Sequence, residues 1–168
     1  MAGDEAHGGA PGEQTGESGA RGPGSGEPRR LRIVGLHHLT LICSSLDRSV
    51  AFYRDVLGMS LVKQTHNIDD PEARHFYFGD PEGAAGTLVS LMEYPQMEPA
   101  RAGTGATHHF ALAVGSEDEL HGWHAYLGSR GVPCTEVLDR TYSRSLYLRD
   151  PDGHVVELAS IGPGFAVE

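Results

Sequence analysis

Apolar and polar residues alternate from Leu31 onward, and the spacing of the apolar positions then changes. The alternation in LRIVGLHHLTLI predicts a β-strand over residues 31–42. Apolar residues at helical spacing follow in residues 46–57, after a capping serine pair and before Gly58, so we expect a helix there. Three short strands are expected next, at residues 59–65, 75–79 and 86–94.

The second half of the chain repeats this order. Residues 107–114 alternate again, and Ser116 with Glu119 makes a capping box for a helix that ends at Gly131. Three further strands are expected at residues 133–138, 145–149 and 155–160. In both halves a D-P-x-G turn precedes the last strand. This repeat predicts an α+β fold of two βαβββ modules, at about residues 31–95 and 104–161, whose sheets form a cup.

Composition and charge exclude several classes of protein. Residues 1–30 are rich in Gly, Ser, Glu and Pro, so we expect a disordered tail before one domain over residues 31–168. The formal net charge of −10 argues against nucleic acid as a partner. The sequence shows no signal peptide or membrane-spanning stretch, so we expect a cytoplasmic protein that binds no membrane. Cys43 and Cys134 lack CxxC spacing, and reduced thiols are expected.

The repeat places two histidines and one glutamate where they can meet. His38 lies on the first strand of the first module, His109 at the matching point of the second, and Glu157 on the last strand of the second. Two imidazoles and one carboxylate on one face of an ion form the triad of non-haem Fe(II) oxygenases, which leaves other positions open. Ser90 matches Glu157 in the first module, so we expect three protein ligands to the metal and not four.

Four segments resemble a known family. GLHHLTL, FYRDVLGM, HHFALAV and LYLRDPDGHVVELAS are similar to the glyoxalase, bleomycin-resistance and extradiol-dioxygenase superfamily, whose fold is called vicinal oxygen chelate. The resemblance covers Leu31 to about Ile161 and implies the paired-module fold and a metal at the positions above. Its members include isomerases, thiol transferases, dioxygenases and drug-binding proteins, so the fold alone does not fix the reaction.

A narrower resemblance suggests a reaction. The stretch LVKQTHNIDDPEARHFYFGDPEGAAGTLV and the later GTGATHHFAL resemble dioxygenases that open hydroquinone rings. That resemblance implies Fe(II), or Mn(II), as the metal, with a small dihydroxylated aromatic substrate such as a hydroquinone or catechol and dioxygen as partners. In that group another histidine precedes each metal histidine, as His37 and His108 do here. The resemblance implies proton transfer by His37 or His108 and a donor role for Tyr147, ten residues before Glu157.

The resembled group differs from this chain in length. It is usually about twice as long, with four modules, and its three metal ligands are divided between its two halves. For a chain of two modules the resemblance therefore implies a homodimer. In that dimer His38 would come from one subunit, and His109 and Glu157 from the other.

Each of these residues also has a purely structural interpretation. Neighbours of a strand ligand point to the opposite face, so His37 and His108 would need a bulge or twist to reach the cavity. Tyr147 could equally be a core residue, and Arg140 could either steer a phenolate or be a solvated charge. Among the remaining histidines, His75 is the most favoured to lie beside the cavity. Surface or packing roles are expected for the others, which are His66, His121, His124 and His154.

Three other functions remain open. A thiol transferase of the fosfomycin-resistance kind shares the tyrosine spacing and Thr40, but Val137 stands where that group has a lysine. A lactoylglutathione lyase would want a carboxylate at Ser90 as a fourth ligand. A non-catalytic small-molecule-binding protein of the bleomycin-resistance kind would not need the three metal ligands, which this chain keeps.

Overall fold

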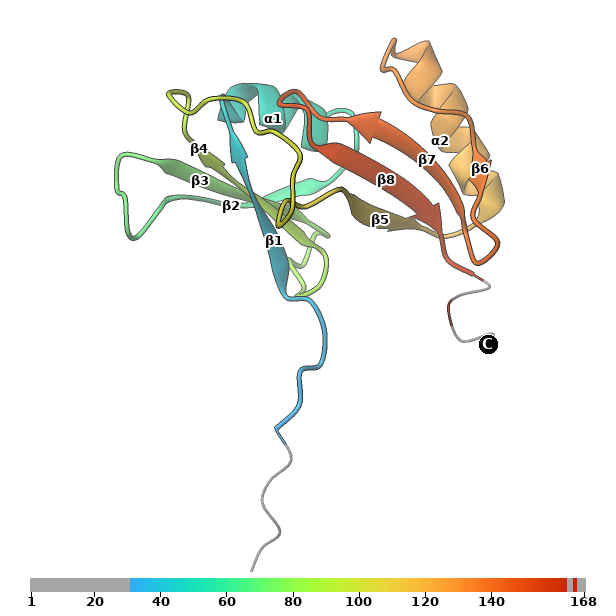
Figure 1. Ribbon diagram of the computed structural model, residues 1–168, viewed down its shortest axis with the longest axis horizontal. Coiled ribbons are helices and arrows are strands. Elements are labelled where there is room, and N and C mark those ends of the chain that lie inside the picture. Colours follow the sequence, from blue (N-terminus) through green and yellow to red (C-terminus); the bar gives the residue numbers. More distant parts are fainter. Residues whose placement is uncertain (1–30, 163–164, 166–168) are drawn as a thin grey trace, which may run out of the picture. The chain divides into compact units, whose positions relative to one another are not determined.

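The computed structural model describes residues 31–162 and Phe165, so the predicted disordered segment 1–30 lies outside the described residues. The chain divides into two units, Met1–Val34 and Gly35–Glu168. All helices and strands of the described residues lie in the second unit (Figure 1).

The first module is a four-stranded sheet with one helix. Its elements are β1 (His38–Cys43), α1 (Leu46–Tyr53), β2 (Ser60–His66), β3 (Arg74–Gly79) and β4 (Leu88–Glu93). The strand order is β1-β4-β3-β2, in which β1 runs parallel to β4 and the other neighbours are antiparallel. The parallel pair places the first and last strands of the module side by side.

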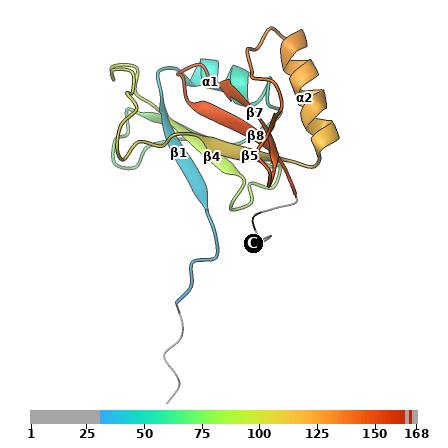
Figure 2. The ribbon, with the colours of Figure 1, turned by 45° about the vertical axis from the view of Figure 1, so that its right-hand side comes forward.

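The second module has the same topology. Its elements are β5 (Phe110–Val114), α2 (Glu117–Ser129), β6 (Leu138–Asp139), β7 (Arg144–Arg149) and β8 (Val155–Ser160). The order is β5-β8-β7-β6, with β5 parallel to β8, and Figure 2 shows α2 running along this sheet. The repeated arrangement confirms the predicted α+β fold of two βαβββ modules.

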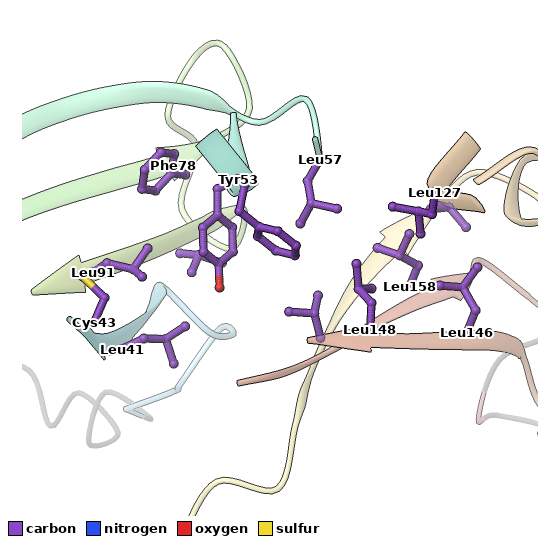
Figure 3. Close-up of a cluster of buried hydrophobic side chains, with 14 of the residues drawn as sticks. Leu41, Cys43, Tyr53, Leu57, Phe78, Leu91, Leu127, Leu146, Leu148 and Leu158 are labelled. Atoms are coloured by element: carbon purple, nitrogen blue, oxygen red, sulfur yellow. The ribbon is translucent and has the colours of Figure 1, made fainter. Parts of the chain in front are cut away.

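Alternation along the strands gives each sheet one buried face. Val156 and Leu158 are almost fully buried on β8, whereas Glu157 between them points to the other face. Figure 3 shows the buried side chains of both modules. Those labelled in the first module are Leu41, Cys43, Tyr53, Leu57, Phe78 and Leu91, and those labelled in the second are Leu127, Leu146, Leu148 and Leu158. The faces opposite this core are left for the candidate site. Within residues 31–162, neither α1 nor α2 could span a membrane.

The first strand and the first helix are shorter than predicted. β1 begins at His38 because its partner β4 begins opposite it, at Leu88. Without that partner, residues 31–36 are exposed despite their alternating pattern. The helix begins as expected, because the Ser45 side chain accepts the Arg48 N–H. It ends at Tyr53, and the chain continues in hydrogen-bonded turns to Gly58, whose φ of 72° suits glycine.

The strand predicted over residues 133–138 is mostly absent. Only Leu138 and Asp139 pair with β7, and Cys134 forms one isolated bridge with Leu148. Proline at 133 has no N–H to donate, which disfavours regular pairing there. The predicted strand is therefore replaced by an irregular segment that leads into a short hairpin.

The turn between β7 and β8 contacts the first module. The Tyr53 hydroxyl donates to Oδ2 of Asp150 (2.9 Å), and the Ser44 hydroxyl donates to Oδ1 of Asp152 (2.5 Å). His154 Nδ1 also lies 2.8 Å from Oδ2 of Asp150. Burial opposes ionisation of Asp150, but hydrogen bonds from His154 and Tyr53 outweigh it and lower its pKa. The hydrogen bond between His154 and Asp150 also raises the pKa of His154.

Candidate metal centre

His109 and Glu157 meet on the face of the second sheet opposite the core. Glu157 pairs with Ala111 across the parallel strands β5 and β8, and His109 lies two residues before Ala111. Nε2 of His109 is 2.9 Å from Oε2 of Glu157. The small Ala111 side chain leaves this part of the face to the carboxylate. Two of the three predicted metal ligands, His109 and Glu157, therefore lie close together.

Ser145 fixes the other oxygen of the same carboxylate. Its hydroxyl donates to Oε1 of Glu157 at 2.5 Å, and both residues are buried, at 0% and 7% exposure. Sequence reasoning did not single out Ser145. Strand alternation carried the signal, because Ser145 and Tyr147 are two residues apart and share a face of β7.

The preceding histidines contact the predicted metal ligands in both modules. Nδ1 of His108 is 2.7 Å from Nδ1 of His109, and Nδ1 of His37 is 3.0 Å from Nδ1 of His38. The alternation rule does not separate these neighbours because β1 begins only at His38 and β5 only at Phe110, so the rule does not apply to the residues before them. No bulge is needed to bring the two rings together. In each pair one nitrogen holds the proton that the other accepts.

A cavity of about 850 Å³ opens over this face of the second sheet. Its lining includes His108, His109, Glu157, Tyr147 and Arg140. The rings of Tyr147 and His109 meet edge to face, with centroids 5.8 Å apart. The Arg140 guanidinium lies 5.2 Å from the centroid of the Tyr147 ring. Tyr147 is therefore a cavity residue in this structure and not part of the buried core.

His38 lies on the first sheet, apart from this pair. Its ring centroid is 6.3 Å from that of Tyr77, which pairs with Ser90 as Tyr147 pairs with Glu157. Among residues 31–162, no group of three or more His, Cys, Asp or Glu side chains is placed to hold a metal ion. The structure of one chain thus joins His109 with Glu157 but does not bring His38 to them.

His75 is also buried on the first sheet. It is 6% exposed, its Nδ1 lies 3.4 Å from the Tyr77 hydroxyl, and its Nε2 has no hydrogen-bond partner. Burial, with the nearby charges of His38 and Lys63, lowers the pKa of His75. It shares the sheet with His38, but its neighbours do not form a metal-binding group.

The groups at the His109–Glu157 pair suit a divalent metal ion. An imidazole nitrogen and a carboxylate oxygen are donors that iron, manganese and zinc accept, and the carboxylate is already fixed by a buried hydroxyl. The cavity on the same face leaves room for further ligands. The residues present therefore fit part of a metal site, and a third protein donor would complete the predicted triad.

Comparison with known proteins identifies relatives of two kinds. MhqA of Bacillus subtilis, named as a candidate ring-cleaving dioxygenase, is 31% identical over 86% of this chain and 45% of its own length. The chlorohydroquinone/hydroquinone 1,2-dioxygenase of Sphingobium indicum is 32% identical over 72% of this chain and 38% of its own. The metallothiol transferase FosB of Staphylococcus epidermidis is 27% identical over 75% of this chain and 83% of its own length. The chain spans less than half the length of the dioxygenase relatives.

The structural comparison and the family model identify the same superfamily. A solved structure of a candidate dioxygenase from Bacillus subtilis matches with a TM-score of 0.70 and 31% identity, over 75% of this chain and 40% of that one. The family model described as Glyoxalase/Bleomycin resistance protein/Dioxygenase superfamily matches residues 35–158. The chain therefore belongs to the glyoxalase, bleomycin resistance protein and dioxygenase superfamily.

Proposed function

We propose that this protein is a metal-dependent dioxygenase that cleaves a dihydroxylated aromatic ring such as a hydroquinone or catechol. The observation that carries the proposal is the approach of His109 to Glu157 within 2.9 Å, in a cavity that also holds Tyr147 and Arg140. The names of the ring-cleaving relatives support the reaction class. The proposed metal is Fe(II), with Mn(II) as the other candidate, and its proposed ligands are His38, His109 and Glu157.

The metal and the chain have separate tasks in this proposal. When bound, Fe(II) would supply the acidification of a coordinated hydroxyl and the binding of dioxygen at an open position. The chain would hold that ion, orient the aromatic ring and manage the protons. The cavity next to the His109–Glu157 pair has the size of a small-molecule site.

The contact between His108 and His109 supports a direction for proton transfer in this proposal. Nε2 of His109 faces Glu157 and is the nitrogen proposed to bind the metal, so its Nδ1 holds the ring proton. That proton would be donated to Nδ1 of His108, 2.7 Å away, and a His108 ring that accepts at Nδ1 carries its own proton on Nε2. His108 thus begins the reaction as a donor at Nε2. This favours a role in which His108 returns a proton to the substrate over one in which it accepts a proton from the substrate.

Tyr147 and Arg140 would orient the substrate. Both line the cavity, and the edge-to-face contact with His109 keeps the Tyr147 ring beside the proposed metal ligand. The Tyr147 hydroxyl would donate to a substrate oxygen. The Arg140 guanidinium, which lies over the Tyr147 ring, would attract an ionised ring hydroxyl.

The third ligand requires a second copy of the chain in this proposal. His38 lies on a different sheet from Glu157, and the described residues of one chain do not assemble the three ligands. The isologous contacts of a homodimer would allow the first module of each subunit to complete the site of the other. Two equivalent sites would then form per dimer.

A thiol transferase is the second candidate, because FosB is also a relative. Val137 packs against the core at the position where a lysine is expected for that function. Thr40, which is shared with that group, is hydrogen bonded to Ser90. Arg140 and Arg149 do line the cavity, so the site is not without cations for an anionic substrate.

Oxygen consumption separates the two candidates. The chain would be loaded with Fe(II) without oxygen, mixed with hydroquinone or catechol, and then exposed to oxygen. We expect oxygen uptake with a new absorbing product, and neither from a Glu157→Gln variant loaded in the same way. Absence of uptake across a panel of aromatic diols, together with glutathione conjugation of an epoxide, would replace the dioxygenase with the transferase.

A further inference from the structure

We infer that Ser145 is a positioning residue that fixes the Glu157 carboxylate, so that only Oε2 faces the metal. The inference rests on the proposed function, because Glu157 is a proposed metal ligand. It assigns this task to a residue that the sequence pattern did not single out. One buried hydrogen bond and a contrast between the two modules carry it.

The geometry divides the two carboxylate oxygens between different partners. Ser145 donates to Oε1 at 2.5 Å, whereas Oε2 faces Nε2 of His109 at 2.9 Å. A serine hydroxyl has a single proton, and a bond to a carboxylate uses it fully. Oε1 is therefore held toward Ser145, while Oε2 remains on the side of His109. The carboxylate can rotate only if this hydrogen bond breaks.

Burial makes that rotation costly. Ser145 is 0% exposed and Glu157 is 7% exposed, so water does not replace the serine hydroxyl readily. Ser145 lies on the central strand β7, where Leu146 is fully buried on the opposite face of the sheet. The donor is thus held by rigid backbone and not by a loop.

The first module supplies an internal comparison. Tyr77 pairs with Ser90 as Tyr147 pairs with Glu157, so Ser90 takes the place of the carboxylate and His75 the place of Ser145. Ser90 is hydrogen bonded to Thr40 at 2.9 Å. The serine donor thus accompanies the carboxylate in the second sheet, and both are replaced in the first. This is the pattern expected if Ser145 serves the carboxylate and not the fold shared by both modules.

Metal binding tests the inference without relying on catalysis. Co(II) and Fe(II) would be titrated anaerobically into the full chain and into Ser145→Ala, Ser145→Thr, Glu157→Gln and Ser49→Ala variants. Ser49→Ala is the matched control, because Ser49 is also 0% exposed but lies on α1. Circular dichroism melting would establish that each variant is folded. The visible spectrum of bound Co(II) would report changes in the ligand oxygen.

Removal of the hydroxyl should weaken metal binding roughly 10–100-fold, the usual effect of losing a group that orients a ligand. The Co(II) spectrum of Ser145→Ala should also change. Ser145→Thr, which keeps the hydroxyl, should restore both, and Ser49→Ala should match the wild type. Unchanged affinity and spectrum in folded Ser145→Ala, alongside lost binding in Glu157→Gln, would overturn the role of Ser145 alone. A wild-type chain that binds neither metal would overturn the proposed function and the inference together.

Discussion

Thr40 and Ser90 are joined by a hydrogen bond of 2.9 Å across β1 and β4, at the register position that Ala111 and Glu157 occupy between β5 and β8. The two modules thus carry chemically different pairs of side chains at equivalent positions. One uses two hydroxyls, and the other uses a methyl group and a carboxylate. The exchange explains why the carboxylate of the candidate metal centre lies in the second module.

A carboxylate placed at position 90 should be poorly tolerated. Ser90 is 0% exposed, and Thr40 occupies the space that Ala111 leaves free in the other sheet. Ser90→Glu should lower the free energy of unfolding by about 2 kcal/mol or more, because a buried carboxyl group would lack partners. Adding Thr40→Ala should recover about 1 kcal/mol of that loss. Denaturant unfolding of both single variants and the double variant measures the coupling, and strictly additive effects would contradict the exchange.

Tyr147 and Arg140 should affect different kinetic constants. If the Tyr147 hydroxyl donates in the transition state, Tyr147→Phe should lower kcat for ring cleavage by about 100-fold with little change in KM. If Arg140 attracts the ionised substrate, Arg140→Gln should raise KM about tenfold and leave kcat nearly unchanged. Steady-state oxygen uptake gives both constants. Wild-type kcat in Tyr147→Phe would return that residue to a packing role.

The contact between Asp150 and His154 should make stability depend on pH. The pKa of His154 is raised from its ordinary value of 6.5, so its contribution is full below that value and is lost as pH rises through the raised pKa. The pKa of Asp150 is lowered from 3.8, so its contribution is full above that value and is lost as pH falls through the lowered pKa. The pair should stabilise most between these two values.

A His154→Gln variant isolates this effect, because Tyr53, Asp152 and the other titrating groups are common to both proteins. Its deficit in the free energy of unfolding should be largest at about pH 5.5 and smaller at about pH 9. Denaturant unfolding of both proteins across that range is the measurement. A deficit of constant size would mean that the charge of His154 has no part in joining the β7–β8 turn to α1.

Part of this architecture could be predicted from the sequence, because a repeat constrains both copies. The alternation around Glu157 and the start of the second repeat at His109 are local patterns, and the parallel pairing of β5 with β8 makes them neighbours. The limits of single elements depended on distant partners instead. β1 begins at His38, where Leu88 of β4 can pair with it. The alternating residues before His38 carry no signal for this limit.

The hydrogen bonds of the site were harder to predict. Ser145 contacts Glu157 from the neighbouring strand β7, twelve residues earlier in the chain, and a serine in a strand usually has no special role. The alternation rule predicted that His108 would point away from the cavity, but His108 lines it, since the rule applies inside a strand and His108 precedes β5. In the proposed site His38 comes from a second chain, and the patterns along one sequence report contacts within a chain and not between chains.

Mixing two inactive variants tests most directly whether three residues from two copies form one site. His38→Ala and Glu157→Ala subunits would be unfolded together, refolded as a mixture, loaded with Fe(II) and assayed for oxygen uptake and bound iron. In a mixed dimer one site would combine intact His38 from one chain with intact His109 and Glu157 from the other. Random pairing should therefore restore about a quarter of the wild-type activity.

The matched control is a mixture of His109→Ala and Glu157→Ala subunits, in which every site lacks one of the two groups that lie 2.9 Å apart within one chain. That mixture should stay inactive and bind little iron. Recovery to about a quarter in the first mixture and none in the second is the predicted result. Equal failure of both mixtures, with each variant folded and wild-type dimers active after the same refolding, would contradict the shared metal centre.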